Sequence, residues 1–381
     1  MGRQDSLQIN KPIEAASHAP KYVYASQEFF DLEKKNVFLK EWLLVARVEE
    51  VSSPGDYMTT SILGEPVVVC RDKKGKLGAF INACIHRGAA IASGAGNTKA
   101  FVCPYHGWTY DLGGRLKGAP GMEGIEGFDP SKCSLQEVAL SEWAGNIFIC
   151  FDSNPPSFAD FIAEFEKDFG FLRLGDLCLG GKRERIVNCN WKLVVENLMD
   201  FYHVPVLHEN TLAKTGFEWA HDKGTSLKKD GGYSVFYKSA PNVFGGKSLY
   251  KPIPWLEDRG ESFASLGIRP PNLLLFGRSD SVRPIVLWPV SLTQCRWVSY
   301  NLYPPETLLD PELREKEKRY SEWQDAVLGE DLTMIDSLQQ SLASDLFVPG
   351  RMSLMEKPAH NFLNAHIRRV LGDRDPAGFK G

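Results

Sequence analysis

Residues 84–110 read CIHRGAAIASGAGNTKAFVCPYHGWTY and contain two short motifs that each pair a cysteine with a histidine. Cys84 and His86 form the first pair, and Cys103 and His106 form the second. A structural zinc ion accepts two cysteines and two histidines, but zinc-binding motifs usually group like residues together and at other spacings. Four unrelated core residues would rarely fall into two such pairs among glycine, proline and aromatic residues. The segment therefore predicts a metal centre of another kind.

The interleaved order of the two pairs suits a Rieske centre. In such a centre two thiolates hold one iron of a 2Fe-2S cluster and two imidazoles hold the other. Each motif then supplies one ligand of each type. Neutral imidazoles in place of thiolates remove negative charge from the reduced cluster and raise its reduction potential. We expect a cluster that accepts electrons readily.

The chain around these motifs, from Trp42 to about Asp152, consists of short runs rich in valine, isoleucine and phenylalanine, separated by glycine, proline and aspartate. Such runs predict short antiparallel strands. The stretch SNPPSFADF at residues 153–161 predicts a linker, and helical segments mix with further strands beyond it. We expect an α+β protein in three parts: an N-terminal helical segment at 1–40, a β domain at 41–154 and a second domain at 155–381.

The composition excludes several classes of protein. Charged residues make up 24% of the 381 residues and the net charge is -4, which gives no basic footprint of nucleic-acid binding. The chain has no uncharged apolar run of roughly 18 residues and no apolar core of a secretion signal near its start, although MGRQDS matches the short N-myristoylation pattern. Eight cysteines are too few for a disulfide scaffold of this length. We expect a cytoplasmic protein that binds neither nucleic acid nor a membrane.

A second group of metal-binding side chains lies in ENLMDFYHVPVLHEN, residues 196–210. On one ideal helix His203 and His208 would point about 140° apart and could not bind one ion together. Pro205 is expected to end or bend the helix between them. The polar residues upstream share one stripe of an otherwise apolar helix, which is either its wet side or a functional line in a buried helix: Glu196, Asn197, Asp200 and His203.

A long charged helix is expected from near Pro311, with an interruption at Gly329 and a second part that ends near Leu342. Positions 331, 335, 338 and 342 read Asp, Ile, Leu and Leu and have the spacing of one helix face. Asp331 therefore takes a core-facing position on an apolar stripe. A lone carboxylate there is costly unless it is paired or bound to a metal.

Two histidines and one carboxylate form the facial triad that holds a non-haem ferrous ion and leaves coordination positions open. The candidate carboxylates are Glu330, Asp331 and Asp336. Glu330 and Asp336 lie off the apolar stripe and are expected to be solvated. The pattern predicts His203, His208 and Asp331 as the ligands of an Fe(II) ion.

CIHRG followed by CPYHGWTYDLGGRL resembles the Rieske signature of the aromatic ring-hydroxylating oxygenase family, in its large alpha subunit. The family pattern Asp-x-x-His-x-x-x-x-His, followed by a distant helix-borne Asp, is similar to Asp200, His203, His208 and Asp331 here. The closing segment GRMSLMEKPAHNFLNAHI is similar too, so the resemblance covers nearly the whole chain. It implies an N-terminal all-β Rieske domain and a helix-grip catalytic domain of antiparallel sheet and helices.

The resemblance also implies roles outside the ligand sets. Asp200 would be a bridge that hydrogen-bonds His203 and reaches a Rieske histidine, His106, of a neighbouring subunit in a head-to-tail homotrimer, with or without a beta subunit. Carboxylates in that position orient a metal-bound imidazole and tune its basicity. Asn197 is expected beside Asp200 as a second catalytic residue.

The expected function is that of a terminal oxygenase, which uses electrons from the 2Fe-2S cluster and O₂ at Fe(II) to mono- or dihydroxylate an aromatic or related small organic substrate, as in aromatic hydrocarbon catabolism. The alternative is a monooxygenase that removes an N- or O-methyl group from a methylated amine or a methoxy-aromatic. The sequence has no glycine-rich dinucleotide motif, so a separate reductase, with or without a ferredoxin, must supply electrons. Residues near the iron motif or in inward-facing strand runs are expected to line the substrate pocket: Asn197, Val204, Leu207, Phe217, Trp219, Phe276 and Trp288.

Overall fold

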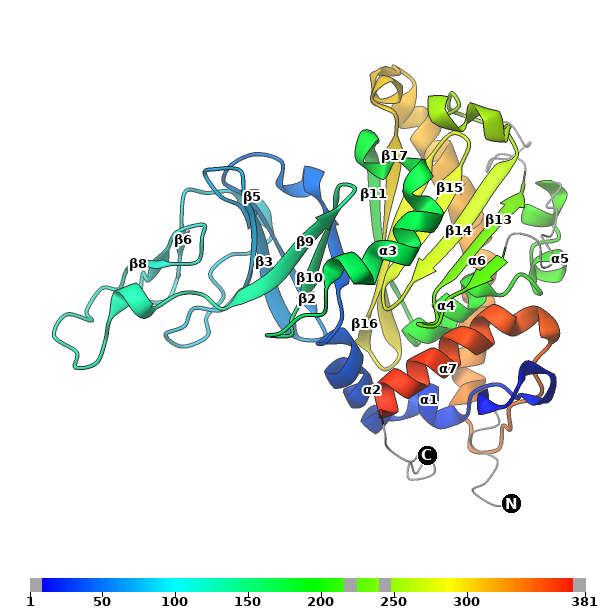
Figure 1. Ribbon diagram of the computed structural model, residues 1–381, viewed down its shortest axis with the longest axis horizontal. Coiled ribbons are helices and arrows are strands. Elements are labelled where there is room, and N and C mark those ends of the chain that lie inside the picture. Colours follow the sequence, from blue (N-terminus) through cyan, green and yellow to red (C-terminus); the bar gives the residue numbers. More distant parts are fainter. Residues whose placement is uncertain (1–8, 216–224, 240–247, 373–381) are drawn as a thin grey trace. The chain divides into compact units, whose positions relative to one another are not determined.

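The computed structural model describes residues 9–215, 225–239 and 248–372. Contacts divide the chain into two compact units (Figure 1), one of residues 39–161 and one of residues 1–38 together with 162–381. Within the described ranges, no helix combines the length and the apolar character needed to cross a membrane.

The unit of residues 39–161 is built almost entirely of antiparallel strands. Its main sheet has seven strands in the order β1-β10-β9-β4-β3-β2-β5, and a small sheet has the order β6-β7-β8. The strand bounds are β1 Leu43–Arg47, β2 Asp56–Ile62, β3 Glu65–Arg71, β4 Leu77–Ile81, β5 Ala95–Asn97, β6 Phe101–Val102, β7 Thr109–Tyr110, β8 Leu116–Gly118, β9 Glu137–Trp143 and β10 Asn146–Cys150. The short runs of β-branched and aromatic residues therefore form the predicted strands.

The tight turn between β7 and β8 requires glycine at position 114. Gly114 has a φ of +80°, and a Cβ atom there would collide with the ring of Phe80. The amide of Gly114 donates to the carbonyl of Asp111, and the carboxylate of Asp111 accepts from the amide of Arg115. Strands β7 and β8 therefore form a hairpin with glycine in its turn.

The other unit contains an antiparallel sheet of seven strands in the order β11-β17-β16-β15-β14-β13-β12. The strand bounds are β11 Cys178–Val187, β12 Thr225–Leu227, β13 Tyr233–Lys238, β14 Phe263–Arg269, β15 Leu273–Arg278, β16 Val282–Ser291 and β17 Gln294–Tyr303. The helix bounds are α1 Lys21–Ala25, α2 Gln27–Glu33, α3 Phe158–Phe169, α4 Trp191–Met199, α5 Val204–Leu207, α6 Leu313–Leu342 and α7 Lys357–Leu371.

Helices cover both faces of this sheet. In Figure 1 helix α3 crosses in front of the strands, and α6 runs behind them. Gly267 of β14 leaves room for Phe165 and Phe169 of α3, because a Cβ atom at that position would overlap their rings. Because side chains alternate along a strand, the neighbours of Gly267 point to the opposite face, where the functional site lies. The chain is thus an α+β protein with one antiparallel β unit and one unit of antiparallel sheet and helices.

The N-terminal helices and α7 are joined by a buried charge cluster. Lys192 of α4 donates to the carboxylate of Glu33 at 2.7 Å, and Nε2 of His366 on α7 lies 2.7 Å from the same oxygen. All three residues are fully buried. Each charge in the cluster therefore depends on the others for compensation.

Two expectations about the helices are wrong. Helix α6 continues through Gly329 without interruption, since one exposed glycine costs a helix only about 1 kcal/mol relative to alanine. The stripe that begins at Asp331 turns out of the core at Leu338, which is 50% exposed, and Gln339 is buried in its place. Position 338 lies only about 20° from Asp331 around the helix, so the 3.6-residue period does not explain its exposure; the buried residues at this end of the helix are Ile335, Gln339 and Leu342.

Candidate active site

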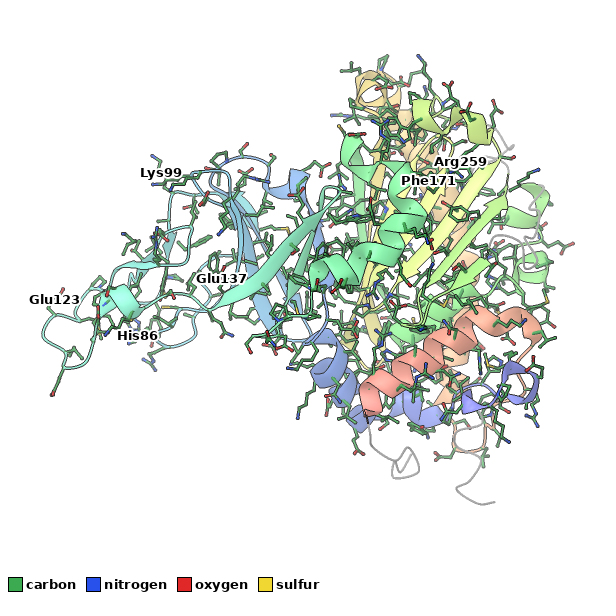
Figure 2. The ribbon with its side chains drawn as sticks, in the orientation of Figure 1. His86, Lys99, Glu123, Glu137, Phe171 and Arg259 are labelled. Atoms are coloured by element: carbon green, nitrogen blue, oxygen red, sulfur yellow. The ribbon has the colours of Figure 1, made fainter. Side chains whose placement is uncertain are left out.

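The two predicted pairs of iron-sulfur ligands lie on two loops of the first unit. Cys84 and His86 follow β4, and Cys103 and His106 lie between β6 and β7. Both cysteines are 2% exposed, whereas both histidines are exposed. Figure 2 labels His86 on one of these loops. The sulfurs face inward and the imidazoles face outward, as an asymmetric cluster with two kinds of ligand requires.

Aromatic rings orient the two histidines. His86 stacks on Trp108 with an interplanar angle of 4°, and His106 stacks on Tyr105 with ring centroids 3.8 Å apart. The Nδ1 atoms of the two histidines lie 3.1 Å apart. Both nitrogens can therefore reach one metal atom.

The surroundings of the cysteines favour thiolates. Burial by itself raises the pKa of Cys103, but the backbone amides of Tyr105 and His106 donate to its sulfur and bring the pKa below the usual value. The hydroxyl of Tyr110 lies 3.2 Å from Sγ of Cys84. A site with two buried sulfurs, one of them with a lowered pKa, and two converging imidazoles fits a Rieske cluster.

The second predicted ligand set comes together in the other unit. The ligand atoms of His203, His208 and Asp331 lie within 4.8 Å of one another. Oδ1 of Asp331 is 3.4 Å from Nε2 of His203 and 3.0 Å from Nε2 of His208. Two imidazoles and one carboxylate on one side of a metal leave open positions, so the arrangement fits a mononuclear non-haem iron.

The local chain explains how the two histidines meet, and it differs from the prediction. Helix α4 ends at Met199, before the histidines, with Asp200 as its C-cap. Pro205 therefore does not break a long helix; it lies in the first turn of the short helix α5, where its missing N–H costs nothing. His203 and His208 flank the two ends of α5, and their ring centroids are 5.2 Å apart.

Each iron-site histidine is held from behind by a carboxylate. Nδ1 of His203 lies 3.3 Å from Oδ2 of Asp200, and Nδ1 of His208 lies 2.6 Å from Oε2 of Glu330. A proton on each Nδ1 donates to these acids and leaves each Nε2 free for a metal. Asp200 contacts His203 and is not one of the three converging ligand residues.

The prediction that Glu330 is solvated is wrong. Its carboxylate accepts hydrogen bonds from Thr211 and His208, each at 2.6 Å. Glu330 lies off the apolar stripe of α6, so periodicity alone assigned it to solvent. Only the contact with His208, far away in the sequence, shows that this flank of the helix faces the iron-site histidines. Asn197 has a related role, because its Nδ2 donates to Oδ1 of Asp331 at 3.1 Å.

The pKa shifts follow from this surplus of carboxylates. Burial lowers the pKa of His203, but hydrogen bonds to Asp200 and Asp331 outweigh it and raise the pKa to about 9. The pKa of His208 is also raised, because Asp331 and Glu330 outweigh burial. The two imidazoles in turn bring the pKa of Asp331 below its usual value despite burial. A metal cation satisfies the same negative charge that attracts protons to these rings.

A cavity of about 130 Å³ opens beside the three ligand residues. Asn197, Val204 and Phe276 line it, as predicted from sequence. Leu207 and Trp288 do not; Trp288 lies on the opposite face of β16, where it packs on Arg296. The predicted pocket residues Phe217 and Trp219 lie outside the described residues.

The sequence analysis did not foresee the mixture of rings and cations in this cavity. Five aromatic side chains line it: Phe201, Tyr237, Phe276, Trp297 and Trp323. Four arginines line it as well: Arg183, Arg185, Arg278 and Arg283. Strand pairing explains this grouping, because Arg283 lies opposite Phe276, and Arg183 and Arg185 lie opposite Ser299 and Trp297 on one sheet face.

Comparison with known proteins assigns a family to each of the two units that carry these residues. Residues 41–129 match the family model of the Rieske [2Fe-2S] domain, and residues 174–372 match that of the ring hydroxylating alpha subunit (catalytic domain). Chloroplastic choline monooxygenase of Arabidopsis thaliana is 28% identical over 369 residues, which cover 92% of this chain and 82% of that protein. The carnitine monooxygenase oxygenase subunit of Escherichia coli (strain K12) is 29% identical over 331 residues, 85% of this chain and 84% of that subunit.

A third relative is the glycine betaine monooxygenase oxygenase subunit of Chromohalobacter salexigens, 34% identical over 194 residues, which cover 51% of this chain and 43% of that subunit. Among solved structures, a quaternary ammonium Rieske monooxygenase has a TM-score of 0.78 at 23% identity, covering 97% of this chain and 98% of its own. A naphthalene 1,2-dioxygenase mutant has a TM-score of 0.76 at 22% identity, covering 99% and 97%. At these identities the structures share the fold, which is common to enzymes for very different substrates.

The catalytic-domain model alone matches more than half of the chain, and the Rieske model matches most of the unit that carries the cysteine-histidine pairs. The chain therefore belongs to the ring-hydroxylating oxygenase alpha-subunit family, and it is a Rieske-type oxygenase with a 2Fe-2S cluster and a mononuclear non-haem iron.

Proposed function

We propose that this chain is the terminal oxygenase of a multicomponent monooxygenase that removes a methyl group from a small quaternary methylammonium compound. The observation that carries the proposal is that choline, carnitine and glycine betaine, after which its relatives are named, are all trimethylammonium compounds. The expectation of aromatic hydrocarbon catabolism has no such support, since the likeness to naphthalene dioxygenase extends only to the fold.

The cavity suits a methylated ammonium group. Aromatic faces attract cations whose charge is spread over methyl groups, which is how aromatic cages recognise quaternary ammonium ligands. Phe201, Tyr237 and Trp323 bring such rings to the same cavity as the triad. A volume of about 130 Å³ is close to the roughly 150 Å³ of a cavity that holds one benzene molecule, and it favours a small substrate over a polycyclic one.

We assign the iron to His203, His208 and Asp331, and the cluster to the two cysteine-histidine pairs. When bound, the ferrous ion activates O₂ with electrons supplied through the 2Fe-2S cluster. Asp200 and Glu330 hold the two imidazoles by their Nδ1 protons, and the apolar walls of the cavity exclude bulk water. Asn197 holds the carboxylate of Asp331 by a hydrogen bond.

The net reaction balances as a monooxygenation. Hydroxylation of one methyl group consumes O₂, two electrons and two protons, and it releases water. The hydroxymethyl group then loses its hydroxyl proton, the C–N bond breaks and its electron pair stays on nitrogen. The products are formaldehyde and the amine with one methyl group fewer.

The electrons come from a separate reductase, with or without a ferredoxin. We further propose that they pass from His106 of one subunit to Asp200 of the next in a homotrimer. The partly buried Asp200 supports this assignment, because its carboxylate contacts both the ring of His203 and the amide of Tyr202.

The test is product analysis with the full-length protein, its cluster and iron restored, supplied with NADH and a generic reductase. Glycine betaine, carnitine and choline are compared with naphthalene and benzoate. We expect formaldehyde and the demethylated amine, in a one-to-one ratio, from at least one ammonium compound. Diols or phenols from the arenes, with no formaldehyde from any amine, would overturn the proposal in favour of aromatic hydroxylation.

A further inference from the structure

The four arginines of the catalytic cavity are not equivalent. Arg183 and Arg185 both bind the carboxylate of Asp325, at 2.6 Å and 2.5 Å. Arg278 is 7% exposed, and its Nη1 lies 3.4 Å from the carbonyl oxygen of Ser239. Arg283 is the residue whose charge the surrounding protein compensates least.

The guanidinium of Arg283 lacks an anionic partner within the described part of the chain. Its Nε is sealed from solvent and makes no hydrogen bond there. Its recorded contact is with the ring of Phe276, whose centroid lies 4.9 Å from Cζ. Burial lowers the pKa of Arg283, and the positive charge of Arg278 acts in the same direction. Arg283 as a whole is partly exposed, but a guanidinium with a buried, unpartnered Nε is costly, and proteins retain one mainly where a ligand completes it.

The acids of the cavity are already committed elsewhere. Asp331 lies against both iron-site imidazoles, and Asp200 holds His203 and the amide of Tyr202. The lining of the cavity thus contains three ligand residues for a metal and also Arg283, which has no anionic partner within the described residues. A ligand with a methylated nitrogen and no negative group would meet uncompensated positive charge.

We infer that Arg283 binds a carboxylate of the substrate, so that the substrate is a small methylated ammonium acid, a zwitterion, and not a simple cation such as choline. The inference rests on the proposed function and narrows its substrate class. Planar guanidinium matches the two oxygens of a carboxylate, and the charge-assisted bond is strongest in a site shielded from water. The carboxylate at Arg283 then orients the molecule so that its methyl groups face the three metal-ligand residues.

Glycine betaine, its methyl ester and choline form a matched set of probes, since all three have the trimethylammonium group and only the first has a carboxylate. The variants are Arg283→Gln, which removes the positive charge, and Arg283→Lys, which keeps the charge but lacks the planar guanidinium with its paired N–H donors. Arg296→Gln is the control, because Arg296 lies on the opposite sheet face and pairs with Glu184. Rieske absorbance and circular dichroism confirm that each variant is folded.

Two readouts are needed, one of which is independent of turnover. In thermal unfolding of the reduced protein under nitrogen, we expect glycine betaine to raise the melting temperature of the wild type more than the ester or choline does. In turnover, Arg283→Gln is expected to raise KM for glycine betaine about 10- to 100-fold and to leave kcat/KM for the ester nearly unchanged. Arg283→Lys is expected to recover part of the loss, and Arg296→Gln to match the wild type.

The inference is overturned if the wild type binds and oxidises choline as well as glycine betaine, or if Arg283→Gln lowers activity on the carboxylate and the ester equally. Such a result leaves the methyl-removal function standing. Conversely, if carboxylates stabilise the wild type but not Arg283→Gln, and no ammonium compound yields formaldehyde, the proposed function fails and the carboxylate site remains.

Discussion

The carboxylate of Glu330 lies 2.6 Å from Nδ1 of His208, so the residue directly before Asp331 in α6 holds the ring whose other nitrogen faces Asp331. One helical segment therefore supplies both a metal-facing carboxylate and the group that orients a metal-facing imidazole. Glu330 thus contacts one nitrogen of the His208 ring and Asp331 contacts the other.

Glu330→Gln removes the acceptor charge behind His208 and weakens the orientation of its ring. We expect the affinity for Fe(II) to fall about 10- to 100-fold, as for other residues that support metal ligands. The measurement is iron titration of the chelator-treated protein, with the Rieske absorbance as internal reference. The matched control is Glu322→Gln, an exposed glutamate on the same helix. Equal iron affinity in the two variants would contradict the role of Glu330.

Asp331→Ala removes the carboxylate between the two imidazoles. We expect the 2Fe-2S absorbance to remain, because the cluster lies in the other unit, while the mononuclear iron and product formation are lost. Metal analysis, which counts irons beyond the two of the cluster, makes the measurement. Asp336→Ala on an exposed part of α6 is the control. Retained turnover in Asp331→Ala would refute the ligand assignment.

Asp200→Asn tests the proposed route from cluster to iron. The amide preserves size but cannot accept the Nδ1 proton as a charged group, so both metals should stay bound while electron transfer slows about 10- to 100-fold. Single-turnover oxidation of the pre-reduced cluster, followed by its absorbance, measures this step. Asp258→Asn, at an exposed position, should behave as the wild type. A normal rate in Asp200→Asn would count against the bridge.

Tyr110→Phe removes the hydroxyl that lies 3.2 Å from Sγ of Cys84. A hydrogen bond to a cluster sulfur stabilises the more negative reduced form, so its loss should lower the reduction potential while the cluster stays assembled. Redox titration followed by circular dichroism gives the potential. Tyr57→Phe is the control, since the ring of Tyr57 packs edge-on against Phe101 in the same unit. An unchanged potential in Tyr110→Phe would show that the hydroxyl does not donate to the sulfur.

The cluster of Glu33, Lys192 and His366 predicts that acid destabilises the catalytic unit. Burial, opposed only in part by Glu33, lowers the pKa of His366 from 6.5 to about 4, and Lys192 and Arg369 act in the same direction as burial. The folded state thus binds fewer protons than the unfolded state at these pH values. The contribution of His366 to the stability of the folded state is therefore complete above pH 6.5, and it is lost as the pH falls toward 4. The pKa of Glu33 is lowered too, despite burial, by Lys192 and His366, so its contribution has the same sign.

The His366 contribution is at most about 3 kcal/mol over that interval. Urea unfolding of the wild type between pH 7 and 4.5 should show the free energy of unfolding falling with acidification, and His366→Gln should flatten the slope. His360→Gln, a half-buried histidine of the same helix, is the control. A slope that His366→Gln leaves as steep as in the wild type would show that another group causes it.

The sequence by itself determined where the chemistry resides. Cys84, His86, Cys103 and His106 could be grouped because the spacing of ligands within each loop is a local property. Strand runs were also readable, but the predicted helix break at Pro205 was wrong, because the helix ends at Met199, before both histidines. Short-range spacing encodes the ligand pairs and the strand runs.

Only the tertiary structure decided what surrounds the iron site. Glu330 lies off the apolar stripe of its helix, and it faces His208 because α5 packs there, more than 100 residues earlier in the chain. Arg283 looks like an ordinary strand arginine until pairing of β15 with β16 sets it opposite Phe276 in the cavity. The alternation of side chains along a strand predicts that the strand has two faces. Which face packs against which helix depends on residues far away in the sequence, so a single strand cannot predict it.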